Sequence, residues 1–141
     1  MNPDELADRV ARGMLAAEGT GPVWGIVIDE ARAGYARLSM TVRADMLNGH
    51  GIVHGGMVFA LADTAFAYVC NGGNEKTVAA QASIVFLGSA RKGETLIAEG
   101  EEAAVAGRSG VTRVTVQTSD GRPIAEFTGY SRTLGGAVVE I

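Results

Sequence analysis

The sequence predicts a single α+β domain over residues 1–141, in which an antiparallel β-sheet wraps around one central helix. Three observations lead to this fold class. The chain has 141 residues, too few for two domains that each hold a secure core. An apolar run, Met57–Cys70, indicates a helix that is buried on most of its sides. Strand-like segments flank this run, two before it and four after it, and short turns join the last four.

The N-terminal residues predict a short amphipathic helix. Asn2 is a suitable N-cap, and Pro3 after it suits the first helical turn. Apolar side chains recur every four residues, at Leu6, Val10 and Met14. The glycines and the proline within residues 19–22 are expected to end this helix.

Two strands are predicted before the central helix, at residues 26–28 and 35–43. Between Ala36 and Arg43 apolar and polar side chains alternate, which indicates a sheet with one buried face. An Asp-Gly pair at residues 120–121 favours a tight hairpin between the last two strands of the chain. The four strands predicted after the helix are Thr77–Leu87, Thr95–Val105, Val111–Thr118 and Pro123–Thr133.

A loop rich in glycine, histidine and asparagine precedes the central helix. It covers residues 44–56 and has no regular hydrophobic period. The helix itself is predicted from about Met57 to Asn71, because Gly72 and Gly73 follow in the usual C-terminal capping positions. Polar groups and bare backbone are therefore concentrated at the start of an apolar helix.

Composition narrows the classes of partner. The 12 Lys and Arg residues against 16 Asp and Glu give a net charge of −4 with no basic cluster, so no nucleic-acid partner is expected. A single cysteine, Cys70, cannot form an internal disulfide, and no Cys/His cluster has the spacing of a metal site. Charged residues among the first 18 exclude a signal peptide, and no apolar run reaches the roughly 20 residues of a membrane span. We expect a soluble, cytoplasmic protein.

Asp63 is the only formally charged side chain in the predicted central helix. An ionised carboxylate that is buried without partners is costly, so something must compensate for it. Two interpretations are open: a structural carboxylate in a polar crevice, or a nucleophile or general base in a substrate cleft. The loop residues Asn48, His50 and His54 allow the same choice between surface hydrogen bonding and a part in the chemistry.

Gly55 and Gly56 lie where the loop enters the central helix. Backbone N–H groups at this place lack partners within the helix, and the helix dipole favours negative charge there. The pair is therefore a natural site for an oxyanion. The alternative is that two glycines before a helix merely allow a turn.

The run Met46–Gly56, continued by Leu61–Tyr68, resembles the signature of the hot dog fold acyl-CoA thioesterases, and most of all the phenylacetate-pathway enzymes of the PaaI type. The resemblance covers residues 25–135, and its Asn…His-Gly-Gly…Ala-Asp pattern is specific to a subfamily. It implies a sheet wrapped around a long helix, and a homodimer or homotetramer with its active sites at the protomer interface. It also implies an acyl-CoA substrate, with a phenylacetyl-type or hydroxyphenylacetyl-type acyl group favoured, and no cofactor besides the CoA of the substrate.

The resemblance implies roles for four residues. The Gly55 N–H donates to the thioester oxygen, and Asp63 attacks the carbonyl carbon or activates water. Asn48 helps to place the carbonyl or the water, and His54 supports the loop. All four positions match the pattern of the family.

Substrate binding is assigned to four more residues, of which two match the family pattern and two lie in a segment that departs from it. Gly56 and Thr64 match the family pattern, but many family members carry an Arg-Pro pair after the strand that ends in Phe-Leu. Here the segment 88–92, Gly-Ser-Ala-Arg-Lys, follows instead. Arg91 and Lys92 are candidate partners for the CoA phosphates, or else part of a solvated turn.

Helix geometry predicts that one chain cannot complete the site. Gly55 and Asp63 are eight residues apart, which is about 12 Å along a helix at 1.5 Å per residue. A donor and a nucleophile that serve one carbonyl must both come within about 3 Å of it. Two antiparallel central helices related by a two-fold axis satisfy this requirement. We therefore expect an obligate dimer.

Other functions are compatible with the same fold. A dehydratase pairs a loop histidine with a helix acid, as His50 and Asp63 could do. A hydratase places a histidine five residues after the aspartate, where this chain has Tyr68. A non-catalytic acyl-CoA binding module is the third alternative, and it requires that Asp63 be dispensable.

Overall fold

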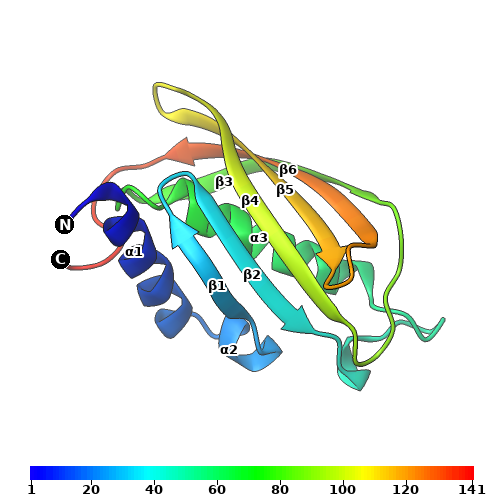
Figure 1. Cartoon of the computed structure of the whole chain (residues 1–141). Coiled ribbons are helices and arrows are strands. Elements are labelled where there is room, and N and C mark those ends of the chain that lie inside the picture. Colours follow the sequence, from blue (N-terminus) through cyan, green and yellow to red (C-terminus); the bar gives the residue numbers. More distant parts are fainter.

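The computed structural model describes residues 1–141 and confirms the α+β class, with a curved sheet around a central helix (Figure 1). None of its helices is both long and apolar enough to cross a membrane. The elements are α1 (Pro3–Ala17), α2 (Thr20–Trp24), β1 (Val27–Arg32), β2 (Tyr35–Thr41), the 3₁₀ turn η1 (Ala44–Met46), α3 (Gly55–Cys70), β3 (Thr77–Phe86), β4 (Thr95–Ala106), β5 (Ser109–Thr118) and β6 (Pro123–Thr133).

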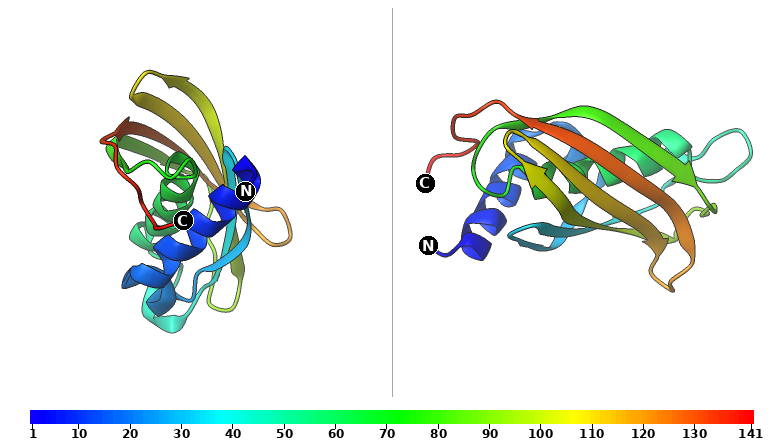
Figure 2. Two further views of the ribbon diagram at one scale, coloured as in Figure 1. Left: turned by 90° about the vertical axis from the view of Figure 1, so that its left-hand side faces the viewer. Right: turned by 90° about the horizontal axis from the view of Figure 1, so that it is seen from above.

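The six strands form one antiparallel sheet in the order β1-β2-β4-β5-β6-β3. Neighbours along the chain pair throughout β4, β5 and β6, whereas β3 pairs with β6, from Thr77 opposite Thr133 to Phe86 opposite Ala125. The sheet therefore has β1 and β3 as its two edges. Helix α1 packs against β1, and α3 lies on the concave face of the sheet (Figure 2).

The core lies between α3 and the inward-facing side chains of the strands. Phe66 of α3 packs against Phe127 of β6, with ring centroids 5.8 Å apart. Gly129 lies directly under Phe66, and a Cβ atom there would come within 2.6 Å of the ring. Leu61 and Leu38 are fully buried on the helix and sheet sides of the same cluster. This close packing holds α3 in one position, which orients the face of the helix that carries Asp63.

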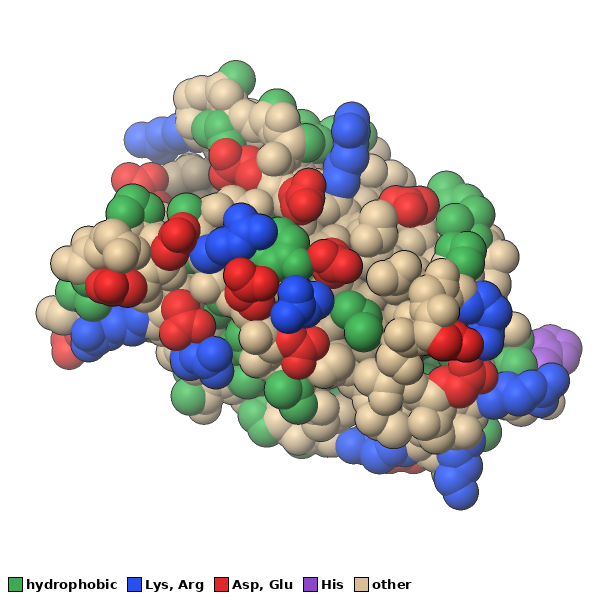
Figure 3. Space-filling view, viewed as in Figure 1, with side chains coloured by type: hydrophobic (Ala, Val, Ile, Leu, Met, Phe, Trp, Pro, Cys, Tyr) green, Lys and Arg blue, Asp and Glu red, His purple; other side chains and the backbone are tan.

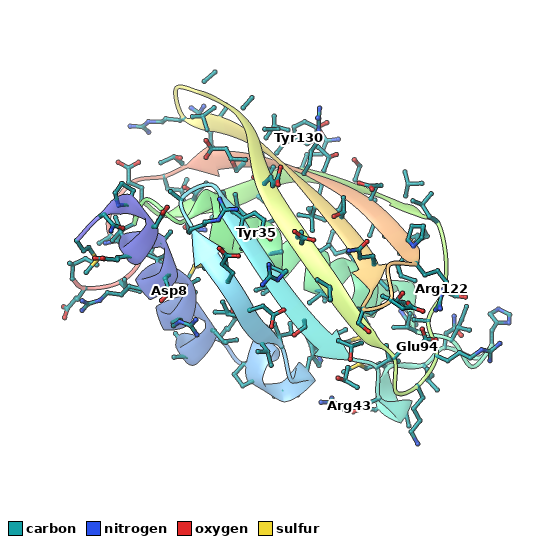
Figure 4. The ribbon with its side chains drawn as sticks, viewed as in Figure 1. Asp8, Tyr35, Arg43, Glu94, Arg122 and Tyr130 are labelled. Atoms are coloured by element: carbon teal, nitrogen blue, oxygen red, sulfur yellow. The ribbon has the colours of Figure 1, made fainter.

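The convex face of the sheet is polar, as expected for the solvent side of an antiparallel sheet. Over β1, β2 and β4 it mixes positive and negative side chains (Figure 3). Tyr35 (Figure 4) donates a hydrogen bond of 2.7 Å to Glu99, and the Arg32 guanidinium lies 4.1 Å from the centroid of the Tyr35 ring. Arg37 and Glu30 form an ion pair at 3.4 Å beside them.

Several predicted element bounds are wrong. Helix α1 confirms the predicted N-terminal helix and has 15 residues. It does end before the predicted breakers, but these residues then form α2, which closes on Gly25 in the left-handed conformation with φ 69°. Neither α2 nor η1 was predicted, because each is a single turn without a hydrophobic period. Strand β1 continues to Arg32, beyond the predicted residue 28.

Candidate active site

Helix α3 begins at Gly55, two residues earlier than predicted, because His54 caps it. The Gly56 N–H donates to Nδ1 of His54 at 2.8 Å, whereas the Gly55 N–H has no hydrogen-bond partner within the chain. The ring of Phe86 lies over this glycine, and a Cβ atom at position 55 would be 3.1 Å from it. The first turn therefore offers one free N–H at the positive end of the helix dipole.

The loop before α3 is shaped by Asn48. Its Oδ1 accepts hydrogen bonds from the N–H groups of His50, at 2.9 Å, and Ile52, at 3.3 Å. The Asn48 N–H also donates to the Ile52 carbonyl at 2.8 Å, which closes the turn. This use of the side-chain oxygen leaves the Asn48 amide Nδ2 as the group that is free for a substrate or a water. His50 and His54 are both exposed.

Asp63 lies in the middle of α3, half-buried and without a hydrogen-bond or ion-pair partner in the chain. Burial raises the pKa of its carboxyl, and no nearby cation opposes this effect. The neighbouring Thr64 hydroxyl donates to the Ala60 carbonyl at 2.7 Å, so it does not compensate Asp63. A carboxyl held at a raised pKa in a cavity is typical of functional sites.

Asp63 lines a cavity of about 450 Å³ between α3, α1 and the C-terminal segment. Tyr68, one turn further along α3, donates its hydroxyl to the Glu18 carboxylate at the end of α1. Burial and this carboxylate both raise the pKa of Tyr68. The rest of the wall is largely apolar and includes Met14, Ala17, Ala67, Val138 and Val139.

The structure keeps the two proposed reaction groups apart within one chain. Gly55 lies in the first turn of α3, and Asp63 lies eight residues further along the same helix, about 12 Å at 1.5 Å per residue. Gly55, His54 and Asn48 do not line the Asp63 cavity.

Arg91 and Lys92 lie in the turn before β4 and are exposed, without an ion pair in the chain. Glu94 holds this turn: its carboxylate accepts from the Arg91 N–H at 3.0 Å and from Arg122 at 2.6 Å (Figure 4). These two hydrogen bonds lower the pKa of Glu94. The side chains of Arg91 and Lys92 are thus the free cations of this turn.

Sequence reasoning missed two parts of the cavity. Tyr68, five residues after Asp63, is about 140° away around an ideal helix, so helical spacing alone does not place it beside Asp63. Neither Glu18 nor the C-terminal valines carry a signal in the sequence.

A second cavity of about 500 Å³ lies at the C-terminal end of α3 and is lined by Cys70, but by none of the predicted site residues. Burial raises the pKa of the Cys70 thiol to about 12.

Comparison with known proteins defines the class of the molecule. Residues 50–125 match the family model described as the thioesterase superfamily. The chain belongs to this superfamily and is a thioester hydrolase with the hot dog fold.

Individual relatives narrow the position within the superfamily. The chain is 37% identical to the acyl-coenzyme A thioesterase PaaI of Escherichia coli K12 over 128 residues, which are 91% of each chain. The solved structure of the E. coli PaaI protein from the phenylacetic acid degradation operon has a TM-score of 0.94, at 35% identity, over 96% of this chain and 99% of that one. A hypothetical thioesterase from Streptococcus pneumoniae, solved with coenzyme A, has a TM-score of 0.76 at 25% identity, over 79% and 90% of the two chains.

Proposed function

We propose that this protein hydrolyses acyl-CoA thioesters to a free acid and CoA, as a thioesterase of the PaaI type. The observation that carries the proposal is Asp63, an unpartnered carboxylate at the wall of a cavity with apolar sides. The free Gly55 N–H on the same helix supports it, because a developing oxyanion needs a fixed donor. E. coli PaaI is named as an acyl-CoA thioesterase, and the S. pneumoniae relative was solved with CoA.

Asp63 has two chemical routes to hydrolysis. As a nucleophile, its carboxylate attacks the thioester carbon, CoA leaves as the thiolate, and water then hydrolyses the mixed anhydride. As a general base, it takes a proton from the water that attacks the same carbon, and the proton passes to the leaving sulfur. In both routes the carbonyl oxygen becomes an oxyanion, which the Gly55 N–H stabilises. Asn48 places the carbonyl or the water, and His54 keeps the first turn in position.

The site requires two copies of the chain, because Gly55 and Asp63 are too far apart in one. A pairing surface is present at the sheet edge, where β3 is paired on one side only. Its apolar side chains are exposed, among them Val85 at 59% and Phe86 at 52%. A long apolar edge strand is otherwise a liability for aggregation. Pairing along β3 would cover this surface and set the first turn of one α3 beside the middle of the other, in a homodimer or in a homotetramer built from it.

The acyl group occupies the Asp63 cavity, and the CoA lies outside it. A phenylacetyl or hydroxyphenylacetyl group suits a cavity of about 450 Å³ whose walls include Met14, Ala17 and Val139. Gly56 and Thr64 flank the two reaction groups and contribute to substrate binding. Arg91 and Lys92 are the free cations for the CoA phosphates.

A hydrolysis screen tests the proposal directly. Arylacetyl-, aroyl-, short-chain and medium-chain acyl-CoA esters are offered to the protein, and the free thiol is measured. We expect thiol release, with arylacetyl esters among the best substrates. Absence of release across the whole panel would contradict hydrolysis. Hydration of an enoyl-CoA, seen as a change in the absorbance of the conjugated thioester, would instead favour a hydratase.

Mixing two inactive chains tests the shared site. An Asp63→Asn chain and a Gly55→Pro chain each lack one reaction group, so neither homodimer has a complete site. A heterodimer has one complete site, and we expect about half of the wild-type activity per dimer. If verified, folded heterodimers recover no activity, the two groups of one site do not come from two different chains.

A further inference from the structure

The C-terminal strap, residues 134–140, lies across the end of the Asp63 cavity. In Figure 1 it runs beside α1, so that the two termini of the chain are neighbours. Val138 and Val139 of the strap line the cavity together with Asp63 and with Gly13 of α1. No helix or strand includes these residues.

Asn74 is the main side-chain tether of the strap, and Arg9 of α1 adds one hydrogen bond, from its guanidinium to the Glu140 carbonyl at 3.4 Å. Asn74, in the turn after α3, accepts hydrogen bonds from the N–H groups of Val138 and Val139 at 3.0 Å each, and donates to the Val139 carbonyl at 3.1 Å. Backbone hydrogen bonds between Lys76 and the start of the strap continue this anchor, with Gly136 as one partner at 2.9 Å. The strap therefore has a defined position although it has no secondary structure.

Val139 is seated in a notch on α1. A Cβ atom at Gly13 would lie 2.7 Å from Cγ1 of Val139, so any larger residue at position 13 would push the strap outward. Glycine inside a helix is destabilising relative to alanine, yet α1 has one at this contact. The notch brings the Val139 side chain against α1 at the wall of the cavity.

The direction of the cavity follows from these contacts. Asp63 lies in the middle of α3, whereas Asn74 lies beyond its C-terminal end. Ala67, Val138 and Val139 line the cavity together with Asp63. An acyl group that lay along α3 from Asp63 past Ala67 would therefore meet the strap. On this path the apolar surface that the strap presents is that of Val138 and Val139.

We propose that Val139, seated in the Gly13 notch and held there by Asn74, determines the length of the acyl group that the enzyme accepts. The proposal rests on the proposed function, since it takes the Asp63 cavity as the acyl site. Each further methylene that finds room is withdrawn from water, which is worth about fourfold in kcat/KM. A methylene that meets Val139 finds no room and gains nothing.

The experiment measures kcat/KM over straight-chain acyl-CoA esters of increasing length for wild type and four variants. Val139→Ala enlarges the end of the cavity, so we expect its optimum to move to longer chains, by about fourfold in kcat/KM for each methylene newly accepted. Val139→Phe should move the optimum to shorter chains. Leu134→Ala is the matched control, because Leu134 is on the same strap, 59% exposed and outside the cavity, and its profile should equal that of wild type.

The two Val139 variants shift in opposite directions, so a general loss of folding cannot imitate the result. Length profiles that coincide for wild type and both Val139 variants would overturn the proposal. Asn74→Gly removes the three hydrogen bonds of the tether while it tolerates the φ of 62° at this position, and it should broaden the profile.

Failure of the proposed function has a different signature. In that case wild type releases no thiol from any ester. Binding of non-hydrolysable acyl-CoA thioethers of the same lengths, measured by calorimetry, then still reports whether Val139 limits the length. A length limit in binding without hydrolysis would support the role of Val139 and contradict the proposed hydrolysis. Hydrolysis with no dependence of the length limit on Val139 would support the proposed function and contradict this inference.

Discussion

The first turn and the middle of α3 carry the two proposed reaction groups, Gly55 and Asp63, which lie eight residues apart and differ in what shapes them. At the first turn the proposed group belongs to the backbone: it is the N–H of Gly55, which the helix geometry leaves unpaired beside the turn that His54 caps. At the middle it is a side chain whose properties come from enclosure by α1 and the C-terminal strap. The donor is thus specified locally, and the carboxylate is specified by tertiary packing.

Removal of the enclosed carboxylate should have the largest effect. Asp63→Asn keeps the size and removes the nucleophile or base, so we expect kcat to fall by 10²-fold or more. Asp29→Asn, an exposed acid on β1, is the control and should leave kcat unchanged. The assay is thiol release, with circular dichroism to confirm the fold. Wild-type turnover in Asp63→Asn would transfer the role of base to another group, with His50 the next candidate.

Removal of the backbone donor should have a slightly smaller effect. Gly55→Pro deletes the free N–H at the first helical position, where proline fits and where the extended His54 is compatible with it. Gly55→Ala adds the same Cβ contact with Phe86 but keeps the N–H. We expect a loss of about 10²-fold in kcat for proline relative to alanine. Asn48→Ala should lose less than Gly55→Pro. Equal rates for the proline and alanine variants would remove the donor role from Gly55.

Enclosure makes activity and stability respond oppositely to pH. The pKa of Asp63 is raised by burial, so the folded protein holds its proton at pH values where the unfolded chain has lost it. As the pH rises from the ordinary pKa of a carboxyl to the raised pKa of Asp63, the activity should rise by at most tenfold per pH unit. Over the same range the contribution of Asp63 lowers the free energy of unfolding. Asp63→Asn should lack this stability loss and melt higher at neutral pH. If the melting temperatures of wild type and Asp63→Asn change with pH in parallel across this range, Asp63 is not desolvated.

The same contrast explains what the sequence could predict. The groups proposed for the reaction at the first turn belong to one short stretch, and their residue types indicate a helix start and an anion site. The start itself was placed two residues late, because histidine is not a common N-cap and two glycines are poor helix formers. Strand β3 was predicted nearly to its bounds, but its pairing with β6 joins segments that are distant along the chain.

The enclosure of Asp63 could not be predicted at all. Its position as the one charge of an apolar helix is visible in the sequence, but the walls are not. Glu18 lies at the end of α1. Val139 lies more than 100 residues after Glu18, in a strap whose sequence has no hydrophobic period. The place of Val139 at the cavity depends on the notch at Gly13 and on the side chain of Asn74, and neither has a local signature.

The smallest expected effect is on the capping of the first turn, and it separates support from chemistry. His54→Ala leaves the Gly56 N–H without its 2.8 Å acceptor, and loss of an N-cap side chain costs about 1 kcal/mol of stability. His54→Asn is the matched control, because asparagine is a strong N-cap and restores the acceptor. If His54 acts only through the first turn, the asparagine variant should recover both the midpoint of urea unfolding and the thiol-release rate. If the asparagine variant recovers the stability but not kcat, the imidazole itself takes part in catalysis, and the first turn is then not made reactive by its backbone alone.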